Sequence, residues 1–122
     1  MAYNVEIQDA SRLIRIVHTG SVLIEEFGEA RQYAVDLMET LGYSRLLVDV
    51  RQTDYRTTMV EQYEFAQENK EMFPPDARVA VILRPEALTD GRFHEDVALE
   101  HGLQFRVFMD PLTAEDWLKA KP

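Results

Sequence analysis

Two short and almost wholly apolar runs, residues 46–50 and 79–83, are separated by a segment with a Pro-Pro pair near its end. Runs of this kind are typical of parallel strands that are covered on both faces of a sheet. Parallel strands need a long crossover connection, which is usually a helix. The alternation therefore predicts an α/β fold with right-handed crossovers and a mostly parallel sheet.

The residues before these runs extend the alternation. Residues 5–7 and 13–17 alternate as strands on either side of a short turn, which predicts an antiparallel hairpin. Gly20 and Ser21 are expected to end the second strand. From Leu23 to Leu41 apolar residues recur on one face of a long helix, and Gly42 is placed to end it in a left-handed cap.

The second half of the chain continues in the same way. Thr58 and Glu61 have the spacing of a capping box that begins a second helix. A third helix is expected with Phe93 and Val97 directed inward, and the spacing of Thr113 and Asp116 resembles a further capping box. The helices are predicted at residues 58–73, 91–101 and 113–118, and a last strand at residues 105–108. The resulting order, β-β-α-β-α-β-α-β-α, predicts a four- to five-stranded mixed sheet with about four helices, in one domain spanning residues 1–122.

Composition excludes several classes of site. The chain has 122 residues, no cysteine and a formal net charge of −9. Without cysteine there are no disulfides and no thiolate ligands. The acidic balance disfavours nucleic acid and anionic membranes as partners. The N-terminal residues show no signal peptide and no run is long enough to span a bilayer, so a cytoplasmic protein without integral membrane association is expected.

Several short segments carry a resemblance to a known family. They are residues 13–16, 45–51, 64–66, 92–95 and 114–118. Together with the order of elements, they resemble the bacterial STAS/SEC14 domain family, which has the SpoIIAA-like fold of anti-sigma-factor antagonists. The resemblance implies a non-enzymatic binding or regulatory module that acts through protein contacts, with a protein partner or a second copy of the chain. The alternative is a protein that binds a small anionic or lipid ligand, and an enzyme is the least favoured class.

The chain departs from that family at one position. The antagonists have an Asp-Ser pair, phosphorylated on the serine, at the start of the helix after the central strand. Here the pair falls at Thr57 and Thr58, so the aspartate is missing. Because a capping box already accounts for Thr58, phosphorylation at this residue is not favoured.

Open α/β sheets bind ligands at the carboxyl ends of their strands, near the point where the strand order reverses. Arg51 and Arg84 fall there and could together clamp a carboxylate or phosphate. Ordinary ion pairs of these arginines with Asp49, Asp54 or Glu86 are the favoured interpretation. The candidate ligand-binding residues at this edge are His18, Asp49, Arg51, Asp54, Arg84 and Asp110.

No catalytic or metal site is predicted. His94 and His101 lie two helical turns apart, about 10.5 Å, which is too far for one metal ion. No nucleophile elbow, glycine-rich dinucleotide motif or phosphate loop is present, and no cofactor is expected. Glu95 and Asp96 are expected to be solvated carboxylates on a helix face.

Four aromatic residues gather around the second helix: Tyr55, Tyr63, Phe65 and Phe73. An apolar pocket between this helix and the third would suit a lipid tail. A filled core is the favoured interpretation, because a chain this short has little room for a large cavity.

Overall fold

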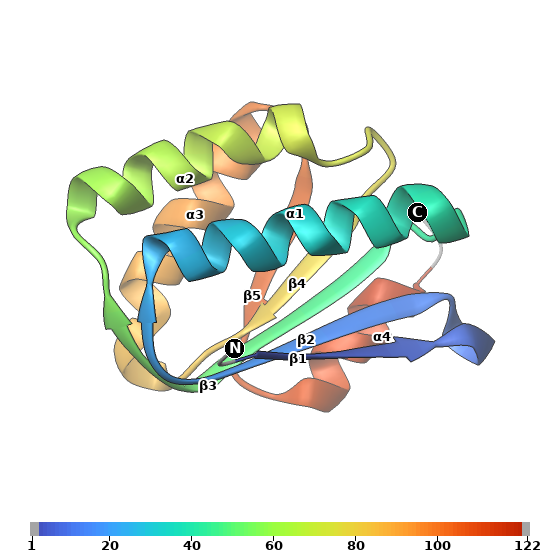
Figure 1. Ribbon diagram of the computed structural model, residues 1–122, viewed down its shortest axis with the longest axis horizontal. Coiled ribbons are helices and arrows are strands. Elements are labelled where there is room, and N and C mark those ends of the chain that lie inside the picture. Colours follow the sequence, from blue (N-terminus) through green and yellow to red (C-terminus); the bar gives the residue numbers. More distant parts are fainter. Residues whose placement is uncertain (1–2, 121–122) are drawn as a thin grey trace.

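The computed structural model describes residues 3–120, and within them five strands and four α-helices alternate in the predicted order (Figure 1). The strands are β1 (Tyr3–Gln8), β2 (Leu13–Leu23), β3 (Arg45–Arg56), β4 (Arg78–Ile82) and β5 (Gln104–Phe108). The helices are α1 (Ile24–Leu41), α2 (Met59–Met72), α3 (Leu88–Glu100) and α4 (Pro111–Lys119). Two short 3-10 turns, Asp9–Ser11 and Pro85–Ala87, complete the order.

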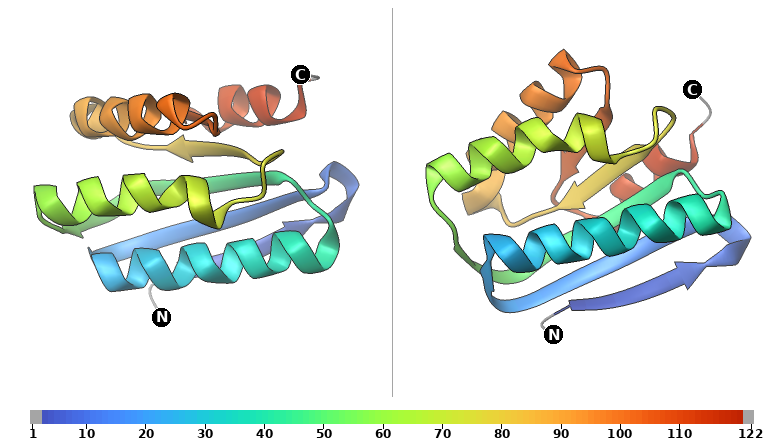
Figure 2. Two further views of the ribbon diagram at one scale, coloured as in Figure 1. Left: turned by 90° about the horizontal axis from the view of Figure 1, so that it is seen from above. Right: turned by 45° about the horizontal axis from the view of Figure 1, so that its top comes forward.

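The strands lie in the sheet in the same order as in the chain, β1-β2-β3-β4-β5. β1 is antiparallel to β2, and every later pair is parallel. Because each right-handed crossover moves one position in the same direction, α1, α2 and α3 all cover one face of the sheet. Figures 1 and 2 show these three helices together, with α4 on the opposite face. The strand order never reverses among the parallel strands, so the expectation of a crevice at such a reversal is wrong.

The pairing of β2 with β3 shifts by one residue at His18. Val17 pairs with Asp49, whereas Thr19 pairs with Gln52, so β3 contains an extra residue. A bulge of this kind exchanges the two faces of the strand beyond it. In a regular strand Val48 and Tyr55 would face opposite sides, because they are an odd number of residues apart. The bulge brings both to the side of the larger core.

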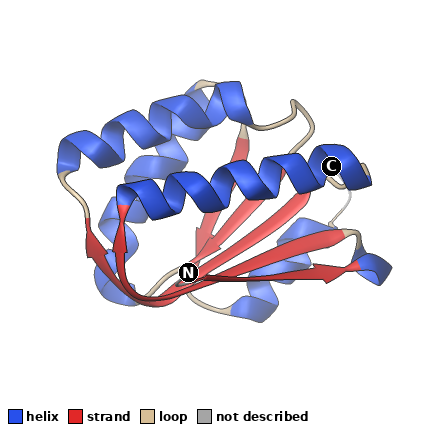
Figure 3. Cartoon of the chain, in the orientation of Figure 1, coloured by secondary structure: helices blue, strands red, loops and turns tan. Residues whose placement is uncertain are grey.

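Beyond the bulge, β2 and β3 continue as a two-stranded arm that curls toward the helices (Figure 3). The prediction that Gly20 and Ser21 end β2 is therefore wrong. Gly20 has a φ of +79° and still pairs with Thr53. Leu23, expected on the buried face of the helix, is instead the last residue of β2 and is 57% exposed. The ladder with β3 outweighs the local turn preference of the Gly-Ser pair.

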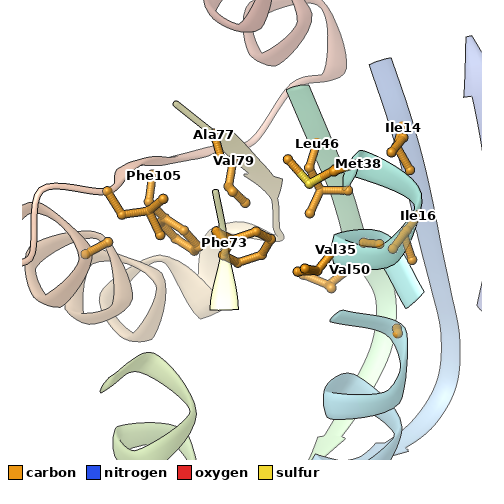
Figure 4. Packing of buried hydrophobic residues seen from close by; sticks show 14 of the residues in the cluster. Ile14, Ile16, Val35, Met38, Leu46, Val50, Phe73, Ala77, Val79 and Phe105 are labelled. Carbon is orange, nitrogen blue, oxygen red and sulfur yellow. The ribbon is translucent and has the colours of Figure 1, made fainter. Parts of the chain in front are cut away.

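Two apolar cores hold the layers together. The larger core lies between the sheet and helices α1–α3, and Figure 4 shows the Phe73 ring between Phe105 and Val50. The smaller core lies under α4 and contains Leu13, Leu47, Ala80, Ile82, Ala114 and Leu118. In β2, β3 and β4, residues of opposite faces therefore belong to different cores, as expected for a sheet covered on both faces.

The helix ends agree with the sequence at two positions and differ at one. Gly42 ends α1 in the left-handed conformation, with a φ of +70°. Thr58 caps α2 in a complete capping box with Glu61. The last helix begins at Pro111, because the Asp110 side chain accepts a hydrogen bond from the Thr113 N–H at 2.9 Å. Thr113 is therefore not the capping residue that the sequence predicted.

Helix α3 faces the sheet differently from the prediction. It begins at Leu88, before Gly91, and Gly91 lies against the sheet. Val97 is buried as predicted, but Phe93 is 39% exposed. Glu95, expected in solvent, is buried, and its Oε2 accepts a hydrogen bond from the Val107 N–H at 2.9 Å. The glycine permits the close approach that puts Glu95 within reach of β5.

Candidate ligand cavity beneath helix α2

Helix α2 packs chiefly against α1 and α3 and not against the strands. Only Ala66 and Asn69 among its residues are buried. A helix that lacks a continuous apolar stripe has no face to lay on a sheet. The space between α2 and the sheet is therefore not filled, and it forms a cavity of about 1010 Å³. The filled core that the sequence favoured at this place is not what the structure shows.

The floor of the cavity is formed by the central strands. Val48 on β3 and Val81 on β4 line it. Both residues remain half-buried although strands flank them on both sides, because the cavity lies over them. Further apolar walls come from α1 and β5, including Phe27 and Phe105. An apolar space of this size is typical of a pocket for a small molecule.

The mouth of the cavity lies where α2 and α3 begin, at the carboxyl ends of the parallel strands. The exposed residues that line it are Thr58, Met59, Val60, Tyr63, Glu64, Thr89, Asp90 and Phe93. Met59 and Val60 are 88% and 66% exposed. The mouth lies at the edge of the sheet where the sequence placed its candidate ligand-binding residues, and Tyr63 belongs to the aromatic group that the sequence related to an apolar pocket.

Of the six candidate ligand-binding residues at the strand ends, His18 is the one that lines the cavity. It lies at the bulge, 2% exposed, with its ring 5.5 Å from the Tyr3 ring and 4.8 Å from the Phe27 ring. Its Nδ1 atom is buried without a hydrogen-bond partner. Burial lowers the pKa of His18 to about 4, so the imidazole is neutral at physiological pH.

Arg31 ties α1 to α2 along one side of the cavity. Its Nη1 atom donates to the Phe65 carbonyl oxygen and to Asn69 Oδ1, both at 2.9 Å. Its Nη2 atom donates to Glu68 at 3.3 Å, and the guanidinium carbon lies 3.8 Å from the centre of the Phe65 ring. Arg31 is itself buried, so these partners compensate a charge that is withdrawn from water.

Two histidine–glutamine contacts tie α2 to α3 along the other side. Nε2 of His94 pairs with Gln62 Oε1, and Nε2 of His101 pairs with Gln67 Oε1 at 3.0 Å. Burial lowers the pKa of His94. Polar contacts on both flanks therefore hold α2 above the cavity in place of apolar contacts with the sheet.

Asp49 and Arg51 lie on the opposite side of the sheet from the cavity. Arg51 donates to both carboxylate oxygens of Asp49, at 3.0 and 2.8 Å, and Arg15 approaches the same carboxylate at 3.6 Å. Burial raises the pKa of Asp49, but the hydrogen bonds and charge of Arg51 outweigh this effect and hold it below its usual value. This cluster belongs to the layer of α4, since Arg15 also pairs with Glu115.

The two arginines do not converge as a clamp. Arg84 pairs with Glu86 at 3.2 Å, and its Nη1 donates to the Arg51 carbonyl oxygen at 3.3 Å. The ion-pair interpretation is thus confirmed for Arg51 with Asp49 and for Arg84 with Glu86. Asp110 caps α4, and Asp54 is exposed on the β2–β3 arm. A ligand-binding role for these residues stays a prediction, and His18 lies on the other face of the sheet.

Two further observations concern residues 3–120. No group of three or more histidine, aspartate or glutamate side chains in this range is arranged to hold a metal ion. No helix in the same range combines the length and the apolar character needed to cross a bilayer.

Apart from Thr58 and Tyr63, the residues at the mouth were missed because each has an ordinary role in a helix when the sequence is considered alone. The signal that was available is the composition of α2. Its apolar residues Met59, Val60, Tyr63 and Phe65 do not follow one helical stripe, so the helix could not bury all of them on the sheet.

Comparison with known proteins bears on the fold alone. No protein-family model matches the chain, and no curated protein matches it. Among solved structures, it is similar to an uncharacterised protein of the DUF3478 family with a SpoIIAA-like fold, from Shewanella loihica. The two share 17% sequence identity, over 96% of this chain and 94% of that chain, with a TM-score of 0.59. The chain therefore has the SpoIIAA-like fold that the sequence resemblance implied.

Proposed function

We propose that this protein binds a small apolar ligand, such as a lipid with one acyl or alkyl chain, in the cavity beneath α2. The cavity itself is the observation that supports this function. Its volume of about 1010 Å³ is at the upper end of the range for small-molecule pockets, about 300–1,000 Å³. A space filled only by water between the sheet and a helix leaves apolar surface hydrated at a cost of about 25 cal/mol per Å².

The arrangement of the walls agrees with this proposal. The floor carries valine, leucine and phenylalanine side chains, and the neutral His18 adds no charge to it. Helix α2 is held at its flanks by Arg31, His94 and His101, so the space beneath it persists without a core that fills it. A chain of methylene groups would replace water against these walls.

Titration with a neutral fluorescent apolar probe, N-phenylnaphthylamine, tests the proposal directly. Saturable binding with one site per chain is expected. Val81→Phe adds bulk to the floor of the cavity and is expected to weaken binding at least about tenfold, because it removes volume from the site. Val5→Phe makes the same change on β1, outside the cavity walls, and is the matched control.

Native mass spectrometry of the protein from its own host provides a second test. A discrete added mass of a few hundred daltons, lost in Val81→Phe but kept in Val5→Phe, is the expected result. An absence of probe binding and of added mass, in protein shown to be folded, would rule out the proposed function.

The second candidate is a regulatory module that acts through protein contacts. The SpoIIAA-like fold and the exposed Met59 and Val60 at the start of α2 favour it. Such residues are typical of contact surfaces when they occur together. Native mass spectrometry separates the two candidates. A dimer or a stoichiometric partner protein would support the module if the double variant Met59→Ser with Val60→Ser abolishes that complex.

A further inference from the structure

The mouth of the cavity brings two aromatic rings together with two carboxylates. Tyr63 on α2 and Phe93 on α3 contact each other, with ring centroids 6.0 Å apart and an angle of 31° between the planes. Both residues line the cavity and remain 52% and 39% exposed. Glu64 and Asp90 also line the cavity, and both are exposed.

The charge at this mouth is negative. Among the described residues that line the cavity, Arg31 is the one lysine or arginine, and it is buried and already bound by Phe65, Asn69 and Glu68. Arg84 is not among the residues that line the cavity. Burial raises the pKa of Tyr55 and the charge of Arg84 opposes this effect, but Arg84 is paired with Glu86. The two histidines that line the cavity, His18 and His94, have lowered pKa values and are neutral at physiological pH.

An aromatic face attracts a cation through its quadrupole, and quaternary ammonium groups are bound in this way between aromatic side chains. Carboxylates beside the rings add a Coulomb attraction for the same charge. They repel an anionic head group, and the net charge of −9 adds to that repulsion.

We propose that the ligand carries a cationic ammonium head, which lies at the mouth against Tyr63 and Phe93, and that its single apolar chain occupies the cavity. This inference rests on the proposed apolar-ligand function and adds the chemistry of the head group. It excludes a free fatty acid as the preferred ligand.

Displacement of N-phenylnaphthylamine by chains of equal length tests the inference. The three competitors are dodecyltrimethylammonium, dodecanol and dodecanoate, each used below its micelle concentration. The ammonium compound is expected to bind about five- to tenfold more tightly than the alcohol, from the usual strength of one exposed cation–π contact with a neighbouring carboxylate. Dodecanoate is expected to bind most weakly, and added salt should reduce the difference between the two charged ligands.

Substitutions identify the groups responsible. Tyr63→Leu and Phe93→Leu keep the mouth apolar, and each should remove most of the preference for ammonium over alcohol. Asp90→Asn and Glu64→Gln should reduce it further when they are combined. Tyr33→Leu and Asp96→Asn, which change exposed residues of the same types outside the cavity walls, should leave the preference unchanged.

The outcomes separate the two proposals. Equal affinity for ammonium and alcohol, with probe binding intact, would overturn the cation inference and leave apolar-ligand binding standing. Tighter binding of dodecanoate that Arg31→Lys removes would overturn it in favour of an anionic ligand. If neither the probe nor any of the three chains binds to folded protein, the proposed function itself fails.

Discussion

Arg31 of α1 and Asn69 of α2 form a buried hydrogen bond of 2.9 Å across the side of the cavity. The two residues that supply the guanidinium and the amide are 38 positions apart in the chain. A buried guanidinium needs its hydrogen-bond acceptors, because an unpaired buried charge is costly. This contact therefore helps to set the distance between α2 and the sheet.

Asn69→Ala should destabilise the protein. It removes one acceptor from the buried Arg31, and the expected loss in the free energy of unfolding is about 1–3 kcal/mol. Urea denaturation measures this loss. Glu68→Ala removes the other side-chain partner of Arg31, which is 58% exposed, and should cost less than about 1 kcal/mol. Equal losses in the two variants would contradict the role assigned to the buried contact.

The stability of the protein should fall as the pH is lowered from about 6.5 to about 4. Burial lowers the pKa of His18 to about 4 in the folded chain, below the 6.5 that is usual for histidine. The unfolded state therefore takes up the proton first, so the contribution of neutral His18 is complete above pH 6.5 and is lost on acidification. The lost free energy is about 3 kcal/mol as an order of magnitude.

Denaturation across this pH range, with His18→Leu as the comparison, isolates the contribution of that residue. His94 also has a lowered pKa and adds a loss of the same sign, so His18→Leu should flatten the profile only in part. An unchanged slope in His18→Leu would show that His18 does not titrate as described.

Gly91→Ala should be destabilising although alanine favours helices. A Cβ atom at this position would lie 2.4 Å from Leu83 Cδ2 and 3.2 Å from Val107 Cγ1, so these buried side chains would have to shift or α3 would have to move from the sheet. We expect a loss of about 1–3 kcal/mol in the free energy of unfolding. Gly28→Ala, where a Cβ would meet no atom within 4 Å, should instead stabilise α1 by up to about 1 kcal/mol. Thermal denaturation of both variants measures this contrast.

Thr58→Ala should cost about 1 kcal/mol, because it removes the oxygen that accepts the Glu61 N–H at 3.1 Å. Thr58→Ser and Thr58→Asp keep an acceptor and should be nearly neutral. Helix content by circular dichroism and urea denaturation together measure the effect. A large change in the binding of a partner protein with Thr58→Asp, at unchanged stability, would instead support a phosphorylation switch at this position.

The order and type of the elements could be predicted because each has a local pattern. Residues 46–50 and 79–83 are apolar on both sides, and Gly42 and Thr58 mark helix ends by their own conformational chemistry. The bulge at His18 and the β2–β3 arm have no such local pattern. They arise because residues of β3, far along the chain, complete the hydrogen bonding of Gly20 and Ser21.

The candidate site could be predicted only in its location. His18 was found because it follows an apolar strand, and it does line the cavity. Asp49 and Arg51 were placed at the correct edge, but the side of the sheet that each residue faces depends on the strand register. Tyr63 was named among the aromatic residues of a possible pocket, but Arg31 and Phe93 were not, because their role depends on how far α2 lies from the sheet, which is a property of three packed helices.

The agreement between strand order and chain order bears on how the protein is made. Each strand within residues 3–120 pairs only with the strand before it and the strand after it in the chain. The hairpin can form first during synthesis, and each later helix–strand unit then adds to an edge that already exists. Once the hairpin has formed, each later strand therefore has its neighbour in the sheet already in place when it leaves the ribosome.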